Sequence, residues 1–168
     1  MTTVYKAGTK DLDDFYPFFV KTIKEYFPYY SGNITNYFLK DVYSLKAIQA
    51  DLKKKARWLY LAKNNDQIVG YLLALKPEGG VAYCQWVAVD KNFRNQHIAT
   101  KMIDFWQKDA LADGAHKLYL TTVEGTEFYT KIGFTVMGTM PKAYYGTDTT
   151  DLYKSIAEPD EKKFLHLE

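Results

Sequence analysis

Residues 85–106 read QWVAVDKNFRNQHIATKMIDFW, a segment rich in strand formers that passes through a short polar turn into an amphipathic stretch. The pattern predicts a strand that runs directly into a helix covering Ile98 to Ala110, whose apolar residues recur at three- and four-residue spacing. The first turn of a helix has free N–H groups and a partial positive charge, so it can hold a pyrophosphate. Arg94, Gln96 and Lys101 would supplement the amides of the turn.

The segments on either side extend this unit into a sheet. Upstream, residues 58–89 change to a period of two, interrupted by NNDQ and PEGG, which predicts a three-stranded antiparallel meander. Downstream, Gly114 would end the helix and KLYLTTV (117–123) reads as a buried strand. Strand, helix and strand then form a crossover unit, which allows its two strands to run parallel, and the expected fold class is mixed α/β.

The rest of the chain supplies shorter elements. We expect a strand at residues 4–7, a helix capped by Thr9 that ends at Pro28, and a second helical segment from Tyr37 to Leu52, interrupted near residues 39–43. After the crossover unit, the pattern predicts a short helix at 127–132 and strands at 134–140 and 150–156.

The bulk composition is that of one ordinary globular domain. The chain has 168 residues, 47% of them hydrophobic and 25% charged, and we expect one domain over residues 1–157 followed by a frayed polar tail at 158–168. A net charge of +2 gives no reason to expect nucleic acid as a partner. The single cysteine, Cys84, permits no internal disulfide, and no signal peptide or membrane span is visible, so we expect a cytoplasmic protein.

Two motifs resemble those of the GNAT superfamily of N-acetyltransferases. The pyrophosphate motif of that family, Q/R-x-x-G-x-G/A, is matched by Arg94-Asn95-Gln96-His97-Ile98-Ala99, with His97 at the place of the central glycine. The second motif, F-Y-x-K-x-G-F, is matched by Phe128, Tyr129, Lys131, Gly133 and Phe134. Histidine and asparagine tolerate left-handed backbone better than branched residues, so we interpret the first motif as modified but intact.

The resemblance implies a fold and a co-substrate. The fold would be a mostly antiparallel twisted sheet of about seven strands, flanked by about four helices, with strands 4 and 5 parallel and splayed. Acetyl-coenzyme A would be the co-substrate, with no metal. The residues implied to bind it are Trp86, Val87, Ala88, Val89, Arg94, Asn95, Gln96, His97, Ile98, Ala99, Thr100, Lys101, Phe128 and Lys131. Thr122 and Gly125 stand where the family often has Asn and Ala.

The same resemblance implies a mechanism of direct acyl transfer. Tyr129 would protonate the departing thiolate, since a tyrosine with an ordinary pKa of about 10 carries its proton at neutral pH. A backbone amide near Trp86 or Val87 would stabilise the oxyanion. The general base stays open, because Glu25, Glu78 and Glu124 are more simply explained as solvated side chains.

The acceptor is the least determined part. The chain is 17% aromatic, and the rings serve either as helix packing or as a pocket wall. As an acceptor wall we nominate Tyr26, Tyr29, Tyr30, Tyr144 and Tyr145. A primary amine of a small molecule or peptide is the expected acceptor, and a homodimer is possible.

Other functions are weaker alternatives. Cys84 alternates with apolar strand residues and has no histidine near it in sequence, which favours a buried small hydrophobe over a nucleophile. The three histidines show no metal-ligand spacing. A non-catalytic acyl-coenzyme A binding or sensing domain and a purely structural protein remain the alternatives to an enzyme.

Overall fold

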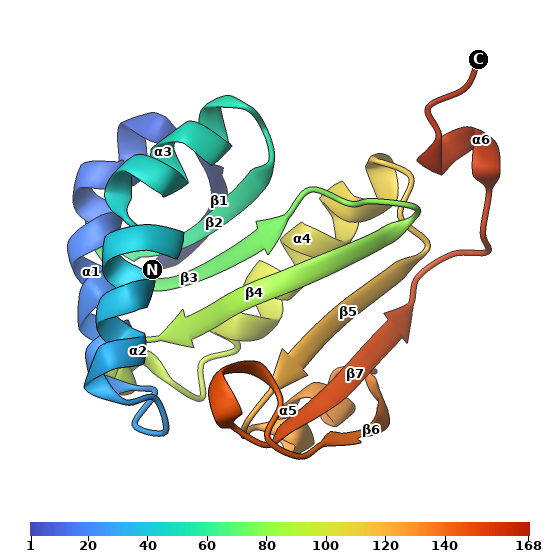
Figure 1. Cartoon of the computed structure of the whole chain (residues 1–168). Coiled ribbons are helices and arrows are strands. Elements are labelled where there is room, and N and C mark those ends of the chain that lie inside the picture. The colour runs from blue at the N-terminus through green and yellow to red at the C-terminus, as the bar shows by residue number, and fades with distance from the viewer.

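Seven strands form one open sheet in the order β1-β2-β3-β4-β5-β7-β6 in the computed structural model, which describes residues 1–168 (Figure 1). Only β4 and β5 pair in parallel; every other neighbouring pair is antiparallel. The predicted meander and mixed α/β class are therefore confirmed. The strands are β1 (Thr2–Ala7), β2 (Arg57–Asn64), β3 (Gln67–Leu75), β4 (Val81–Val89), β5 (Lys117–Thr122), β6 (Thr135–Met140) and β7 (Thr149–Ser155).

Helices cover both faces of this sheet. In Figure 1, α1 to α3 lie together on one side of the sheet and α4 crosses the other. About four helices were expected and six α-helices are present, because the second helical segment is two helices joined by a π-turn at Phe38–Val42 and because the tail forms a helix. The helices are α1 (Leu12–Glu25), α2 (Gly32–Tyr37), α3 (Leu45–Lys53), α4 (Ile98–Ala112), α5 (Thr126–Lys131) and α6 (Glu161–Phe164).

Two hydrophobic cores hold the helices to the sheet. Between α4 and the sheet, Trp106 and Met102 are completely buried. Between α1 to α3 and the sheet, Phe15 and Phe19 pack edge-on against the ring of Tyr71. Truncating one such buried aromatic side chain costs about 3–5 kcal/mol of stability. These cores hold the sheet rigid, and with it the residues at the ends of its strands.

A β-bulge at Gln85 changes which hydrophobic core the even-numbered residues of β4 face. Leu73 pairs with Trp86 and Ala74 pairs with Cys84, so Gln85 is an extra residue in β4. Before the bulge, Cys84 belongs to the core under α4; after it, Trp86 belongs to the opposite core. Bulges bend a strand and increase its twist. The bulge is therefore positioned to turn the rest of β4 away from its neighbour.

The parallel pair opens at the same place. Pairing between β4 and β5 runs from Val81–Lys117 to Cys84–Leu120 and continues no further. In Figure 1 the two arrows separate toward their heads. The expected splay of strands 4 and 5 is thus present, and it begins at the bulge.

Two local expectations were wrong. Thr9 does not cap α1; the turn before the helix is instead closed by Asp11, whose Oδ2 accepts from the Gly8 N–H at 2.9 Å. The tail is not frayed, because α6 places the Phe164 ring 5.9 Å from the ring of His116. A Cβ at Gly114 would collide with the Lys163 backbone, so this glycine lets the tail approach the end of α4.

None of the helices combines the length and the apolar character needed to cross a bilayer.

Candidate active site

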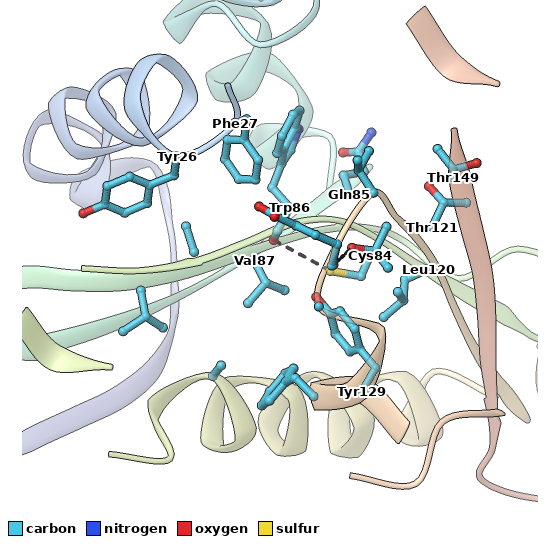
Figure 2. A pocket seen from close by; sticks show the side chains of 18 of the residues that line it. Tyr26, Phe27, Cys84, Gln85, Trp86, Val87, Leu120, Thr121, Tyr129 and Thr149 are labelled. Carbon is cyan, nitrogen blue, oxygen red and sulfur yellow. Dashed lines mark hydrogen bonds between the residues drawn. The ribbon is translucent and has the colours of Figure 1, made fainter. Parts of the chain in front are cut away.

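A cleft of about 1000 Å³ lies where β4 and β5 separate. Its lining comes from β4, the turn before α4, the first turn of α4, the end of β5, α5, the segment between α1 and α3, and the loop between β6 and β7. Figure 2 shows the middle of this cleft, with Trp86 and Gln85 on one side of β4 and Tyr129 on the other. Segments distant in sequence thus meet at one opening in the sheet.

The turn before α4 exposes a row of backbone donors. Asn95 and His97 both have left-handed backbone, with φ of 60° and 58°. The amides from Asn95 to Thr100 donate to no acceptor within the chain, as expected for the first turn of a helix. Together with the positive end of the helix dipole, such a row suits a pyrophosphate. His97 is exposed and lines the rim of the cleft.

Arg94 is held in place beside this turn. Its Nε donates to the carbonyl of Val89 at 3.3 Å, and its guanidinium carbon lies 5.0 Å from the centre of the Tyr26 ring. The Tyr26 hydroxyl also accepts from the Lys91 N–H at 3.3 Å. Tyr26, predicted as part of the acceptor wall, therefore lies at the anion-binding end of the cleft and supports its basic residues.

The edge of β4 beyond the bulge faces the opening. From Trp86 to Val89 the strand pairs with β3 on one side and with no strand on the other. Backbone groups on that free edge are available to an extended ligand. This geometry fits a pantetheine arm, which carries amide groups able to pair with a strand edge, and it leaves the predicted oxyanion donor near Trp86 or Val87 in the cleft.

Tyr129 lies across the opening from this edge. Its ring packs edge-on against Phe128 and Phe134, at centroid distances of 5.1 and 5.7 Å. Figure 2 shows its hydroxyl directed toward Cys84 and β4. Burial, with smaller contributions from Cys84 and Tyr29, raises the pKa of Tyr129 above its usual value. The hydroxyl therefore keeps its proton at neutral pH, which suits a proton donor and excludes a tyrosinate base.

Cys84 lines the cleft but is poorly suited to attack. Its thiol is directed at the carbonyl oxygens of Leu73 and Trp86, 3.9 and 3.7 Å away, and burial raises its pKa. Because the thiolate is the nucleophilic form, this environment argues against a covalent acyl-enzyme. The interpretation as a small buried hydrophobe agrees with this environment.

The other nominated acceptor residues converge from two remote segments. Tyr30 lies in the segment between α1 and α2, and the centre of its ring is 6.2 Å from the centre of the Tyr145 ring, which follows β6. The ring centres of Tyr145 and Phe38 are 4.7 Å apart, and those of Tyr29 and Tyr30 are 4.8 Å apart. Tyr144 lines the cleft from the same loop. The rings therefore form one wall, although they were nominated only as aromatic residues in the two regions that the resemblance associates with the acceptor.

Some predicted residues lie elsewhere, and some lining residues were not predicted. Gln96 and Lys101 do not line the cleft, and Lys131, which does, is paired with Glu127 at 2.9 Å. Of the three carboxylates considered as a base, only Glu124 reaches the cleft. Alternating burial along β4 and β5 indicated sheet residues but not which of them face the opening. The unpredicted lining residues include Phe38, Tyr43, Tyr83, Gln85, Thr121 and Thr149.

The site has no cluster of metal ligands. No three His, Cys, Asp or Glu side chains lie close enough together to hold a metal ion. Thr122, which stands where the family often has Asn, donates its hydroxyl hydrogen to the Glu124 carbonyl oxygen. Gly125 precedes α5 with a φ of 84°, a left-handed conformation that glycine adopts without strain.

A splayed parallel strand pair, an amide-rich turn and a half-buried tyrosine are the features expected of an acyltransferase of the coenzyme A-dependent class. The family model described as "Acetyltransferase (GNAT) family" matches residues 18–134, and the chain belongs to this family. The predicted membership, the enzyme class and acetyl-coenzyme A as acyl donor are thereby confirmed. No curated protein matches the chain significantly in sequence.

Solved structures of acetyltransferases share the fold. The PaiA N-acetyltransferase of Thermoplasma acidophilum, in complex with coenzyme A, aligns with a TM-score of 0.75 at 15% identity, covering 93% of this chain and 99% of that one. A GNAT-family acetyltransferase of Streptococcus pneumoniae gives 0.75 at 17% identity over 94% and 100%. An aminoglycoside 6'-acetyltransferase type Ii gives 0.72 at 18% identity over 94% and 99%. At such identities the likeness concerns the fold.

Proposed function

We propose that the protein transfers the acetyl group of acetyl-coenzyme A to a primary amine of a small molecule or peptide, by direct attack in a ternary complex. The observation that carries this proposal is the single cleft that joins the amide-rich turn, the free edge of β4, Tyr129 and the aromatic wall. A donor bound at one end and an acceptor bound at the other would meet beside Tyr129. Bringing two reactants together in this way supplies a large part of the rate enhancement.

The residues present fit the donor. The amides from Asn95 to Thr100 and Arg94 would hold the pyrophosphate, and Val87 and Val89, which line the cleft, would lie along the pantetheine arm. When bound, acetyl-coenzyme A supplies an activated thioester carbonyl. The β4 backbone near Trp86 or Val87 would stabilise the negative charge that develops on its oxygen.

Proton balance assigns one role to the chain. An acceptor that arrives as an ammonium ion loses two protons in total as its nitrogen bonds to the carbonyl carbon and the carbon–sulfur bond breaks. One proton is returned to the thiolate, and Tyr129 is the donor at that position. The other goes to solvent, so the reaction releases one proton overall.

Turnover separates this function from non-catalytic binding of acyl-coenzyme A. Purified protein is mixed with acetyl-coenzyme A and a panel of primary amines, and thiol release is followed together with the mass of each amine. Acetylated amine formed in step with thiol supports the proposal. Saturable binding of acetyl-coenzyme A with no acetylated product from any amine or peptide N-terminus would favour the binding domain instead.

A further inference from the structure

The acceptor half of the cleft is aromatic and carries no charge. Its lining between α1 and α3, on the bulged part of β4 and after β6 consists of Tyr, Phe, Trp, Val, Gln and Thr side chains, with no Asp, Glu, Lys or Arg. The charged lining residues, Arg94, Glu124, Glu127 and Lys131, come from the turn before α4 and from the β5–α5 region. Glu124 is the one carboxylate close to this half, since it contributes, after burial and Tyr30, to the raised pKa of Tyr29. An acceptor with several positive charges would therefore have to lose its hydration there with a single carboxylate to replace it.

The rings of this half stay neutral in the physiological range. Burial raises the pKa of Tyr30 and of Tyr43 to about 12. Neither phenolate is therefore available to balance a second ammonium group. A single ammonium can instead be attracted to the faces of aromatic rings.

Three polar side-chain atoms of lining residues lack partners, Trp86 Nε1 and two oxygens that can accept from a ligand donor. Gln85 Oε1 and Thr149 Oγ1 are both buried and form no hydrogen bond within the chain, and only 5% of Thr149 is exposed. Gln85 uses its Nε2 to donate to the Tyr43 hydroxyl at 3.4 Å, which turns the amide so that its oxygen is left free. Buried polar atoms are nearly always paired, so unpaired ones on a cleft wall mark a place for a ligand donor.

We propose that the acceptor is an arylalkylamine with one positive charge, its nitrogen hydrogen-bonded by Gln85 Oε1 and Thr149 Oγ1 and its ring packed against Tyr30 and Tyr145. This inference rests on the proposed acetyltransferase function. The placement follows the cleft, since Gln85 stands next to Trp86 where β4 leaves β5 and the two tyrosines form the wall beyond it (Figure 2 shows Gln85, Trp86 and Thr149). The single charge follows from the single carboxylate, Glu124, beside this half of the cleft.

Three amines test the proposal directly. 2-Phenylethylamine is compared with 2-cyclohexylethylamine, which has the same amine and similar bulk without the aromatic ring, and with spermidine, which has three positive charges. We expect kcat/KM from thiol release to be at least about threefold higher for the aromatic amine than for its saturated analogue, and at least about 100-fold higher than for spermidine. Equal or better use of spermidine would overturn the proposal.

Variants connect the preference to the named residues. Tyr145→Leu should raise the KM for 2-phenylethylamine at least about fivefold while leaving the KM for acetyl-coenzyme A unchanged. Gln85→Glu places a carboxylate in the neutral half and should shift the preference toward spermidine at least about tenfold. Phe105→Leu, at an exposed ring of α4 outside the cleft, is the matched control and should change neither value.

A binding measurement keeps this inference separable from the proposed function. The three amines are titrated calorimetrically into the protein saturated with coenzyme A, where no transfer occurs. If no amine is acetylated, the proposed function fails; tighter binding of 2-phenylethylamine than of the other two would still support the acceptor class. Absence of any preference in this titration, or preference for spermidine, overturns it.

Discussion

Replacing Tyr129 by Phe should remove proton donation and little else. The ring contacts with Phe128 and Phe134 would be kept, and the hydroxyl makes no hydrogen bond within the chain. General acid catalysis contributes about 10²–10⁴-fold to a rate. We therefore expect kcat to fall at least about 100-fold, or about 2.7 kcal/mol in activation free energy, with unchanged affinity for acetyl-coenzyme A.

Steady-state thiol release with a reactive amine gives kcat, and calorimetry gives the affinity. Tyr119→Phe is the matched control, because Tyr119 lies on β5 outside the cleft lining and its hydroxyl donates a hydrogen bond to Asp151 Oδ1 at 3.3 Å. That variant should keep its full kcat. A loss of less than about threefold in Tyr129→Phe, in a protein as stable as the parent, would refute Tyr129 as the proton donor.

Three further predictions concern the scaffold around the site. Gly70→Val should lower the free energy of unfolding, measured by urea titration, by about 1–3 kcal/mol. The reason is that a Cβ at Gly70 would lie 3.2 Å from the Ala88 carbonyl oxygen and 3.3 Å from Met102 Cε. Unchanged stability would show that α4 can move away. His97→Gly should change the affinity for acetyl-coenzyme A by less than about threefold, since His97 is exposed and already has left-handed backbone; a tenfold gain would show that the imidazole obstructs the site. Burial raises the pKa of Tyr30 and Tyr43 to about 12 in the folded state, so their contribution to stability is complete below about pH 10 and is lost as the pH rises toward 12. Exposed tyrosines ionise first, so only the last part of the rise in tyrosinate absorbance should coincide with loss of circular dichroism; full ionisation in a folded protein would contradict this.

The sheet was largely predictable because its signals are local. The meander and the strand–helix–strand unit show clear periods of two and of three to four residues, and their bounds agree to within a few residues. The second helical segment was expected to break near residues 39–43, where a π-turn lies. The tail was missed, because the contact between Phe164 and His116 depends on tertiary structure rather than on any local pattern.

The geometry of the cleft was less visible in the sequence. The motifs indicated the turn before α4 and Tyr129, but the bulge at Gln85 appears only when β4 is paired with β3. Without the bulge, alternation along β4 would assign Trp86 to the same core as Cys84. Likewise, Tyr26 could not be told from Tyr30 by composition, although one contacts Arg94 and the other Tyr145.

Calorimetric titration with acetyl-coenzyme A tests the central claim most directly, namely that the cleft between β4 and β5, with the first turn of α4 at one end, holds the acyl donor. The wild type is compared with Ala99→Trp, which fills the lining at the first turn of α4, and with Ala112→Trp at the exposed far end of the same helix. We predict micromolar binding by the wild type and by Ala112→Trp, and a loss of at least about 100-fold in Ala99→Trp. Equal binding by all three, or no binding by the folded wild type, would contradict the account.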